Sequence, residues 1–115
     1  GFTMYELREQ DTFTWPAKAK VPADGQYISV PFNVTFKVLS QPEISALIGE
    51  DDAGASLRVL REALVSYSGF PVKDSNGRDV DDLEERKDII LSKPYFVNAI
   101  SEAWASGISG RRIKN

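Results

Sequence analysis

Hydrophobic and polar residues alternate in two runs within the first forty positions of the chain. From Phe13 to Val21 the odd positions are apolar, and from Ile28 to Val38 every even position is Val, Ile or Phe. A period of two is typical of a β-strand with one buried face. Residues 22–25 supply proline and glycine turn chemistry between the runs. The pattern therefore predicts an antiparallel hairpin that pairs residues 13–21 with 27–39.

Pro16 lies inside the first run. Proline has no N–H to donate to a neighbouring strand, so we expect this strand at the edge of the sheet or with a bulge. An isolated two-stranded hairpin is marginally stable in water. The apolar face of the hairpin therefore needs a cover, which we expect from the second half of the chain.

The first two predicted helices follow the hairpin directly. Ser40 and Glu43 have the spacing of a capping box, which predicts a short helix that carries Ile44, Leu47 and Ile48. The next apolar residues recur at helical spacing and predict a second helix, which Gly69 would end. These residues are Leu57, Leu60, Leu64 and Tyr67, with Val65 alongside.

Two further helices are predicted in the last third of the chain. Asp81 or Asp82 would open one of them, and Ser92-Lys93-Pro94 would begin the last, which Gly107 would end. The predicted fold class is α+β, with an N-terminal antiparallel β-hairpin or small sheet followed by three or four helices. We expect a single domain over residues 1–115, made of a hairpin (13–39), a helical part (40–107) and a basic tail (108–115).

The 115 residues contain no histidine and no cysteine. A Ser-His or Cys-His nucleophile pair cannot be built without them, and neither can an ordinary zinc site. We therefore expect a protein that acts by binding and is not an enzyme, with no metal and no cofactor. The chain has no apolar run near the ~20 residues that span a bilayer, so no membrane partner is expected. The absence of cysteine suits the cytoplasm.

Two acidic features could suggest metal chemistry. Residues 74–85 have a passing likeness to a calcium loop, but Arg78 occupies the fifth position, where an oxygen ligand is needed. We interpret Asn76-Gly77 as a turn between Val72 and Val80. Carboxylates near the start of a helix also interact favourably with its dipole, and we prefer this interpretation to an acid–base or magnesium site. These carboxylates are Asp79, Asp81, Asp82, Glu84 and Glu85.

The aromatic residues of the strands could form a platform for stacked bases, but the net charge of the chain is −3 and such platforms need basic surroundings. We therefore expect core packing and no nucleic-acid partner. The charge is uneven, with six basic and twelve acidic residues in 41–88 and four basic and one acidic in 89–115. A basic tail can steer a chain toward an acidic partner.

Candidate partner contacts are the apolar residues with no clear place in a core. Phe70 and Val72 flank a proline, where apolar side chains either cover the core or meet a partner, and both alternatives remain open. Ile113 lies among basic residues at the C-terminal end. The basic side chains of the tail would add electrostatic steering. These are Arg111, Arg112 and Lys114.

The order of these pieces resembles the tail assembly chaperones of long-tailed bacteriophages, over about residues 12–115. The segments that carry the likeness are Phe13-Thr14-Trp15-Pro16, Val21-Pro22-Ala23-Asp24-Gly25, Tyr67-Ser68-Gly69-Phe70, Asp74-Ser75-Asn76-Gly77, Leu91-Ser92-Lys93-Pro94, Ala99 to Ala103, and Gly110-Arg111-Arg112-Ile113-Lys114-Asn115. The resemblance implies a phage or prophage protein of the host cytoplasm. Such a chaperone binds the tape measure protein, keeps it soluble and helps to recruit tail tube subunits. In many such phages a frameshift adds a C-terminal extension that contacts the tube protein.

Two alternatives come from other classes. One is a virion structural protein, such as a tail completion subunit. The other is a carboxylate-dependent enzyme or nucleic-acid-processing factor that uses residues 79–85. Self-association into a homo-oligomer is left open. Gene neighbourhood separates the first interpretation from these, because a chaperone gene should precede a very long coiled-coil-like reading frame.

Overall fold

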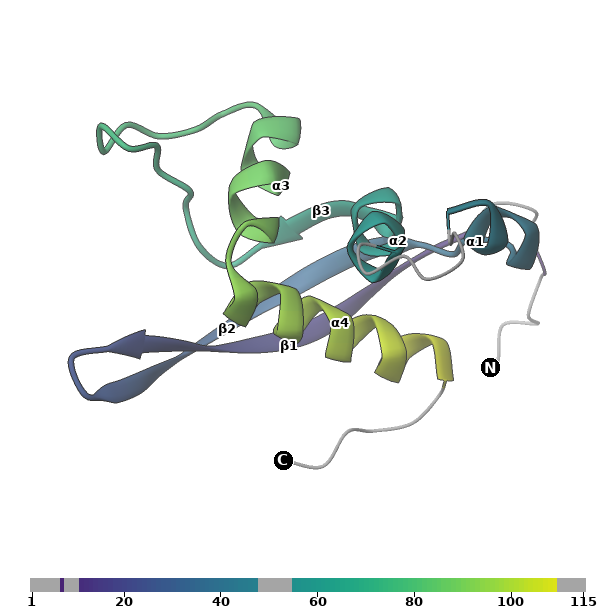
Figure 1. Cartoon of the computed structure of the whole chain (residues 1–115), viewed down its shortest axis with the longest axis horizontal. Helices are drawn as coiled ribbons and strands as arrows, with labels where there is room; N and C mark the ends of the chain where they lie inside the picture. Colours follow the sequence, from purple (N-terminus) through teal and green to yellow (C-terminus); the bar gives the residue numbers. More distant parts are fainter. Residues whose placement is uncertain (1–6, 8–10, 48–54, 110–115) are drawn as a thin grey trace, which may run out of the picture.

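The computed structural model of the chain describes residue 7 and residues 11–47 and 55–109. Its described part forms a three-stranded antiparallel sheet with helices packed on one face (Figure 1). The elements in chain order are β1 (Thr12–Ala23), β2 (Gln26–Lys37), α1 (Gln41–Leu47), α2 (Ala55–Ala63), β3 (Leu64–Ser68), α3 (Leu83–Leu91) and α4 (Pro94–Ser109). The predicted α+β fold is confirmed. None of the described helices is both long and apolar enough to cross a membrane.

The strands β1 and β2 form the predicted hairpin, with pairs from Thr12↔Lys37 to Ala23↔Gln26. Asp24 and Gly25 form the turn with positive φ angles of 27° and 81°. An Asp-Gly pair suits such a turn because glycine carries no β-carbon and aspartate tolerates the left-handed region. The strand order is β1-β2-β3, so β1 is an edge strand, as Pro16 predicted.

The expected helix over Leu57 to Tyr67 is wrong in its second half. The helix α2 ends at Ala63, and Leu64–Ser68 is the strand β3. It pairs with β2 through Asn33↔Ser68 and Thr35↔Ser66, with a register shift at Phe36. Without β3, the second edge of β2 would leave N–H and C=O groups without partners. Sheet pairing therefore overrides the helical spacing of Leu60, Leu64 and Tyr67.

The capping box before α1 and the starts of α3 and α4 are confirmed, but the ends predicted at Gly69 and Gly107 are not. The Ser40 N–H donates to Glu43 Oε2 at 2.9 Å, and the Glu43 N–H donates to Ser40 Oγ at 3.2 Å, which completes the capping box before α1. Asp82 is the N-cap of α3. The helix α4 continues past Gly107 to Ser109, so the helical part extends two residues into the range expected for the tail. Ile48 lies outside the described residues.

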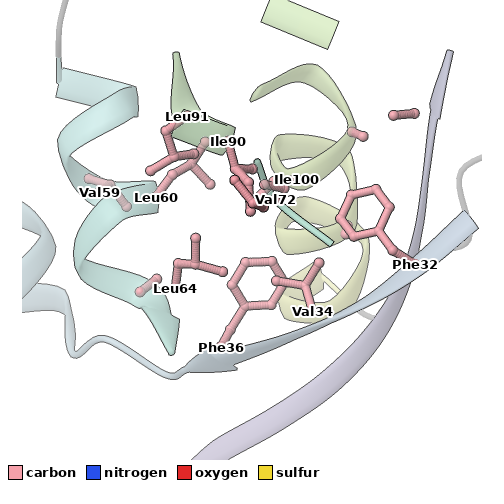
Figure 2. Packing of buried hydrophobic residues seen from close by; sticks show 14 of the residues in the cluster. Phe32, Val34, Phe36, Val59, Leu60, Leu64, Val72, Ile90, Leu91 and Ile100 are labelled. Atoms are coloured by element: carbon pink, nitrogen blue, oxygen red, sulfur yellow. The ribbon is translucent and has the colours of Figure 1, made fainter. Parts of the chain in front are cut away.

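The core lies between the sheet and the helices (Figure 2). Phe32, Val34 and Phe36 of β2 are buried there, but Ile28 is 51% exposed and Val38 is 41% exposed. The expectation that the alternate apolar residues from Ile28 to Val38 all face the core is therefore wrong at both ends. Figure 1 shows the reason at the turn end, where the hairpin projects beyond the helices.

Candidate functional site

Val72 lies in the core and not on a partner-binding surface. Its side chain is 6% exposed and belongs to the buried cluster of Figure 2. The segment around it folds back on itself, since the Val80 N–H donates to the Val72 carbonyl at 2.9 Å. Both valines of this small loop are buried. Of the two alternatives left open for Val72, the structure places it with the core.

Phe70 is half-buried and covers the core. Its ring centroid lies 5.4 Å from that of Phe32, 4.8 Å from Tyr67 and 4.9 Å from Phe96. These contacts draw the Phe70 ring into an aromatic group that joins β2, β3 and α4. Of the two alternatives for Phe70, the structure places it with the core. Arg111, Arg112, Ile113 and Lys114 lie outside the described residues.

The Asp74 side chain holds the loop of residues 72–80 in its turn. The Asp74 carboxylate accepts from the N–H groups of Asn76 (2.8 Å) and Arg78 (3.0 Å), and Gly77 has a φ of 78°. The predicted Asn-Gly turn between Val72 and Val80 is confirmed. Among the residues that the structure describes, no group of three or more acidic side chains is arranged to hold a metal ion.

Two other carboxylates of this region, Asp79 and Asp82, have structural partners. Asp82 caps α3 by accepting from the Glu85 N–H at 3.1 Å. Asp79 accepts from Lys73 Nζ at 2.6 Å, and this hydrogen bond lowers the pKa of Asp79 below its ordinary value. A carboxylate held by a lysine is further stabilised in its charged form. These carboxylates therefore stabilise the loop and the start of α3.

The described surface has an open groove between the edge strand β1 and the helix α4, which we call the β1–α4 groove. It has a volume of about 780 Å³. The helix runs antiparallel to β1, because Phe96 near its start contacts Phe32, the partner of Ala17, and Gly107 near its end faces Phe13. The lining residues are Trp15, Pro16, Ala17, Lys18, Lys20, Pro31, Tyr95, Asn98, Ala99, Glu102, Ala103 and Ser106.

The floor of the groove is formed by apolar side chains. Trp15 and Ala17 come from the inner face of β1, and Ala99 and Ala103 come from successive turns of α4. Ala99 and Ala103 are each 4% exposed and belong to the core, so the accessible apolar surface of the groove comes mainly from Trp15 and Ala17. An apolar floor of this kind favours contact with an apolar partner group.

The rim of the groove is charged. Lys18 and Lys20 lie along β1, and Glu102 lies on α4. Within the described ranges, neither lysine forms an ion pair, whereas Lys37, Arg61, Lys73, Arg86 and Lys87 each pair with a carboxylate. The two unpaired lysines make the β1 rim a basic one.

The free edge of β1 is poorly suited to pair with another strand. The Val38 N–H donates to the Asp11 carbonyl at 2.8 Å, so odd residues of β1 bond to β2 and even residues direct their main-chain groups to the free edge. Pro16 and Pro22 are even residues and have no N–H to offer. Prolines and lysines on an edge discourage the addition of a further strand.

The β1–α4 groove was not expected from the sequence. Alternation identified Trp15 and Ala17 as inward-facing, but nothing local indicates that α4 leaves them partly uncovered. The spacing of Ala99 and Ala103, one helical turn apart, was the available signal, since small residues at this spacing form a flat strip on a helix. The chain matches no protein-family model, and comparisons with curated proteins and with solved structures gave no match.

Proposed function

We propose that this chain is a tail assembly chaperone of a long-tailed phage or prophage. It binds the tape measure protein in the host cytoplasm, keeps it soluble and helps to recruit tail tube subunits. The observation that carries the proposal is the β1–α4 groove, an open, apolar-floored surface with a charged rim. The resemblance of the sequence segments along the chain supports the same function.

The groove supports a function in binding because it offers an apolar surface between two aromatic side chains. Trp15 and Tyr95 are half-buried and supply large contact areas at opposite ends of the groove. Aromatic residues contribute strongly to protein interfaces. A long helical protein with apolar side chains is kept in solution when those side chains are covered.

Co-expression with the product of the long downstream reading frame tests the proposal. We expect this chain to raise the soluble yield of the tape measure protein and to elute with it in size exclusion at low salt. The control is the same co-expression with the Asn98→Trp variant, whose bulky side chain would obstruct the groove from an exposed position of α4. An insoluble partner in both cases, with no complex, overturns the proposal. Recovery of the chain in assembled tails would make it a structural component instead.

A further inference from the structure

The hairpin extends further than the core requires. Residues 18–31, which we call the hairpin arm, project beyond the helices (Figure 1). Of these residues only Ala19 is buried, whereas Tyr27 is 72% exposed and Ile28 is 51% exposed. A strand pair that is not covered by other elements gains little from burial. The arm therefore contributes little to the core and is free to contact another molecule.

The two faces of the arm differ in chemistry. Phe32 is buried against the helices and pairs with Ala17, so the odd residues of β1 face the helices. The even residues of β1, with their partners in β2, form the outer face, which is turned away from the helices. The outer face of the arm consists of six exposed residues, Lys18, Lys20, Pro22, Tyr27, Ser29 and Pro31. The opposite face of the arm carries Val21, Ile28 and Val30.

The charge of the outer face is entirely positive. Neither Lys18 nor Lys20 forms an ion pair with any residue that the structure describes. The outward-facing residues of β1 and β2 include no aspartate and no glutamate. The two ammonium groups therefore have no counter-charge of their own on this face.

The spacing on the outer face defines what would fit it. Lys18 and Lys20 are two residues apart on one strand, which places their Cα atoms about 7 Å apart. Tyr27 pairs with Pro22 and is therefore the diagonal neighbour of Lys20, within reach of a long side chain. The face thus combines two neighbouring cations with one exposed aromatic ring.

This combination fits carboxylates better than a nucleic acid. Surfaces that bind single strands combine several stacking aromatic rings with a basic groove. The outer face of the arm has one aromatic ring, and the chain as a whole has a net charge of −3, which repels a continuous row of phosphates. Two carboxylates and an apolar side chain on one protein segment match the two lysines and the tyrosine without that repulsion.

We propose that the outer face of the hairpin arm binds an acidic segment of the partner, with two carboxylates beside Lys18 and Lys20 and an apolar side chain on Tyr27. This proposal rests on the proposed function, because it assigns the acidic segment to the tape measure protein. Aromatic residues contribute strongly to protein interfaces, so Tyr27 supplies most of the contact. The lysines supply selectivity for acidic sequence.

NMR titration of the labelled full chain tests the location of the contact. The probes are synthetic acidic peptides from the tape measure protein, and the control is the same peptides with Gln and Asn in place of Glu and Asp. We expect the acidic peptides to shift the amide signals of residues 18–20 and 27–29 most, and the neutral peptides to lose this effect. Shifts confined to other residues would overturn the proposal. Tighter binding of an oligo(dT) strand to the same residues would overturn it too.

Two pairs of variants test the chemistry. Lys18→Glu with Lys20→Glu should weaken peptide binding about three- to thirtyfold, because two favourable contacts become repulsive. The control, Arg78→Glu with Lys93→Glu, makes the same change in net charge at exposed positions outside the sheet and should alter binding less than about twofold.

The second pair compares the two faces of the arm. Tyr27→Thr should weaken binding, whereas Ile28→Thr, on the opposite face, should leave it close to that of the wild type. Threonine is used at both positions because it suits a strand. A larger loss in Ile28→Thr than in Tyr27→Thr would place the contact on the other face and overturn the proposal.

The outcomes distinguish this inference from the proposed function. Equal capture of the full-length tape measure protein by wild type, by Tyr27→Thr and by the Lys18/Lys20 variant would overturn the arm assignment and leave the chaperone function standing. If sedimentation shows that these variants abolish self-association of the chain instead, the occupant is a second copy and the assignment is wrong. If the wild-type chain captures no partner, both proposals fall.

Discussion

Gly107 of α4 faces the ring of Phe13 so closely that a β-carbon on Gly107 would lie 2.5 Å from Phe13 Cε2. The Phe13 ring also stacks on Trp104, with centroids 6.0 Å apart, and contacts Phe36 at 5.4 Å. The ring therefore has little freedom to move away. The absence of a side chain at Gly107 lets α4 lie close to β1.

The first prediction concerns Gly107→Ala. In an exposed helix this change would stabilise by up to ~1 kcal/mol. Here we expect a loss of about 1–3 kcal/mol, because the methyl group overpacks against Phe13. In a Phe13→Ala background the same change should instead be neutral or stabilising. Urea denaturation of the wild type, the two single variants and the double variant measures this coupling. If Gly107→Ala changes the free energy of unfolding equally in both backgrounds, the contact between residue 107 and Phe13 does not affect stability.

The second prediction compares two leucines of α2. Leu60 is 3% exposed and packs in the core, whereas Leu57 is 41% exposed. Leu60→Ala should lower the free energy of unfolding by about 2–5 kcal/mol, and Leu57→Ala by less than about 1 kcal/mol. Thermal or urea unfolding checks both. Similar losses at the two positions would mean that the orientation of α2 is wrong.

The hairpin was predictable because its signals are local. The alternation from Ile28 to Val38 and the Asp24-Gly25 turn fix a strand–turn–strand unit without reference to the rest of the chain. The capping box at Ser40 and the cap at Asp82 are equally local, and both are confirmed. The strand β3 was missed because Leu60, Leu64 and Tyr67 fit a helix, and only the free edge of β2 demands a strand.

The candidate site was less accessible to sequence reasoning than the fold. Phe70 and Val72 were identified because apolar residues beside a proline lacked an obvious core, yet the loop of residues 72–80 folds back and buries Val72. The β1–α4 groove depends on how far α4 lies from β1, which follows from contacts such as that of Gly107 with Phe13. Such contacts join positions that are far apart in the chain.

The third prediction concerns Gly69, which has a φ of 133° just after β3. A β-carbon there would lie 2.8 Å from Phe32 Cβ and 3.0 Å from Phe32 Cα, which belong to the rigid strand β2. Gly69→Ala should cost about 2–4 kcal/mol from backbone strain and overlap together. Gly77→Ala is the control, since Gly77 has a φ of 78° but open space around it. It should cost only about 1–2 kcal/mol.

The fourth prediction concerns the pair Lys37–Glu62, which joins β2 to α2 at 2.9 Å. The hydrogen bond from Lys37 lowers the pKa of Glu62 below its ordinary value. The stabilisation from this carboxylate is therefore present above that value and is lost as the pH falls through the lower folded-state pKa. Both side chains are about half exposed, so solvent screening keeps the effect on stability small.

Lys37→Met should move the pKa of Glu62 up toward its ordinary value, as measured by NMR titration of the carboxyl carbon. The lowered pKa of Asp79, which depends on Lys73, should stay the same in this variant. Lys73→Met should produce the reverse result. If the Glu62 pKa does not respond to Lys37→Met, the ion pair is absent in solution.

The last prediction concerns the free edge of β1. Pro16 and Lys18 are both exposed, and Pro16 offers no N–H where a further strand would need one. Replacing Pro16 with Thr and Lys18 with Thr would restore a donor and remove a charge, which leaves a continuous edge from Thr12 to Lys20. We expect this double variant to self-associate as its concentration rises, while its far-UV circular dichroism at low concentration stays close to that of the wild type.

Sedimentation at several protein concentrations measures this association. The control is Lys93→Thr with Pro94→Thr, which alters an exposed lysine and an exposed proline at the start of α4, outside the sheet. The control should remain at the wild-type association state. If the β1 variant also remains there, the proline and lysine do not protect the edge.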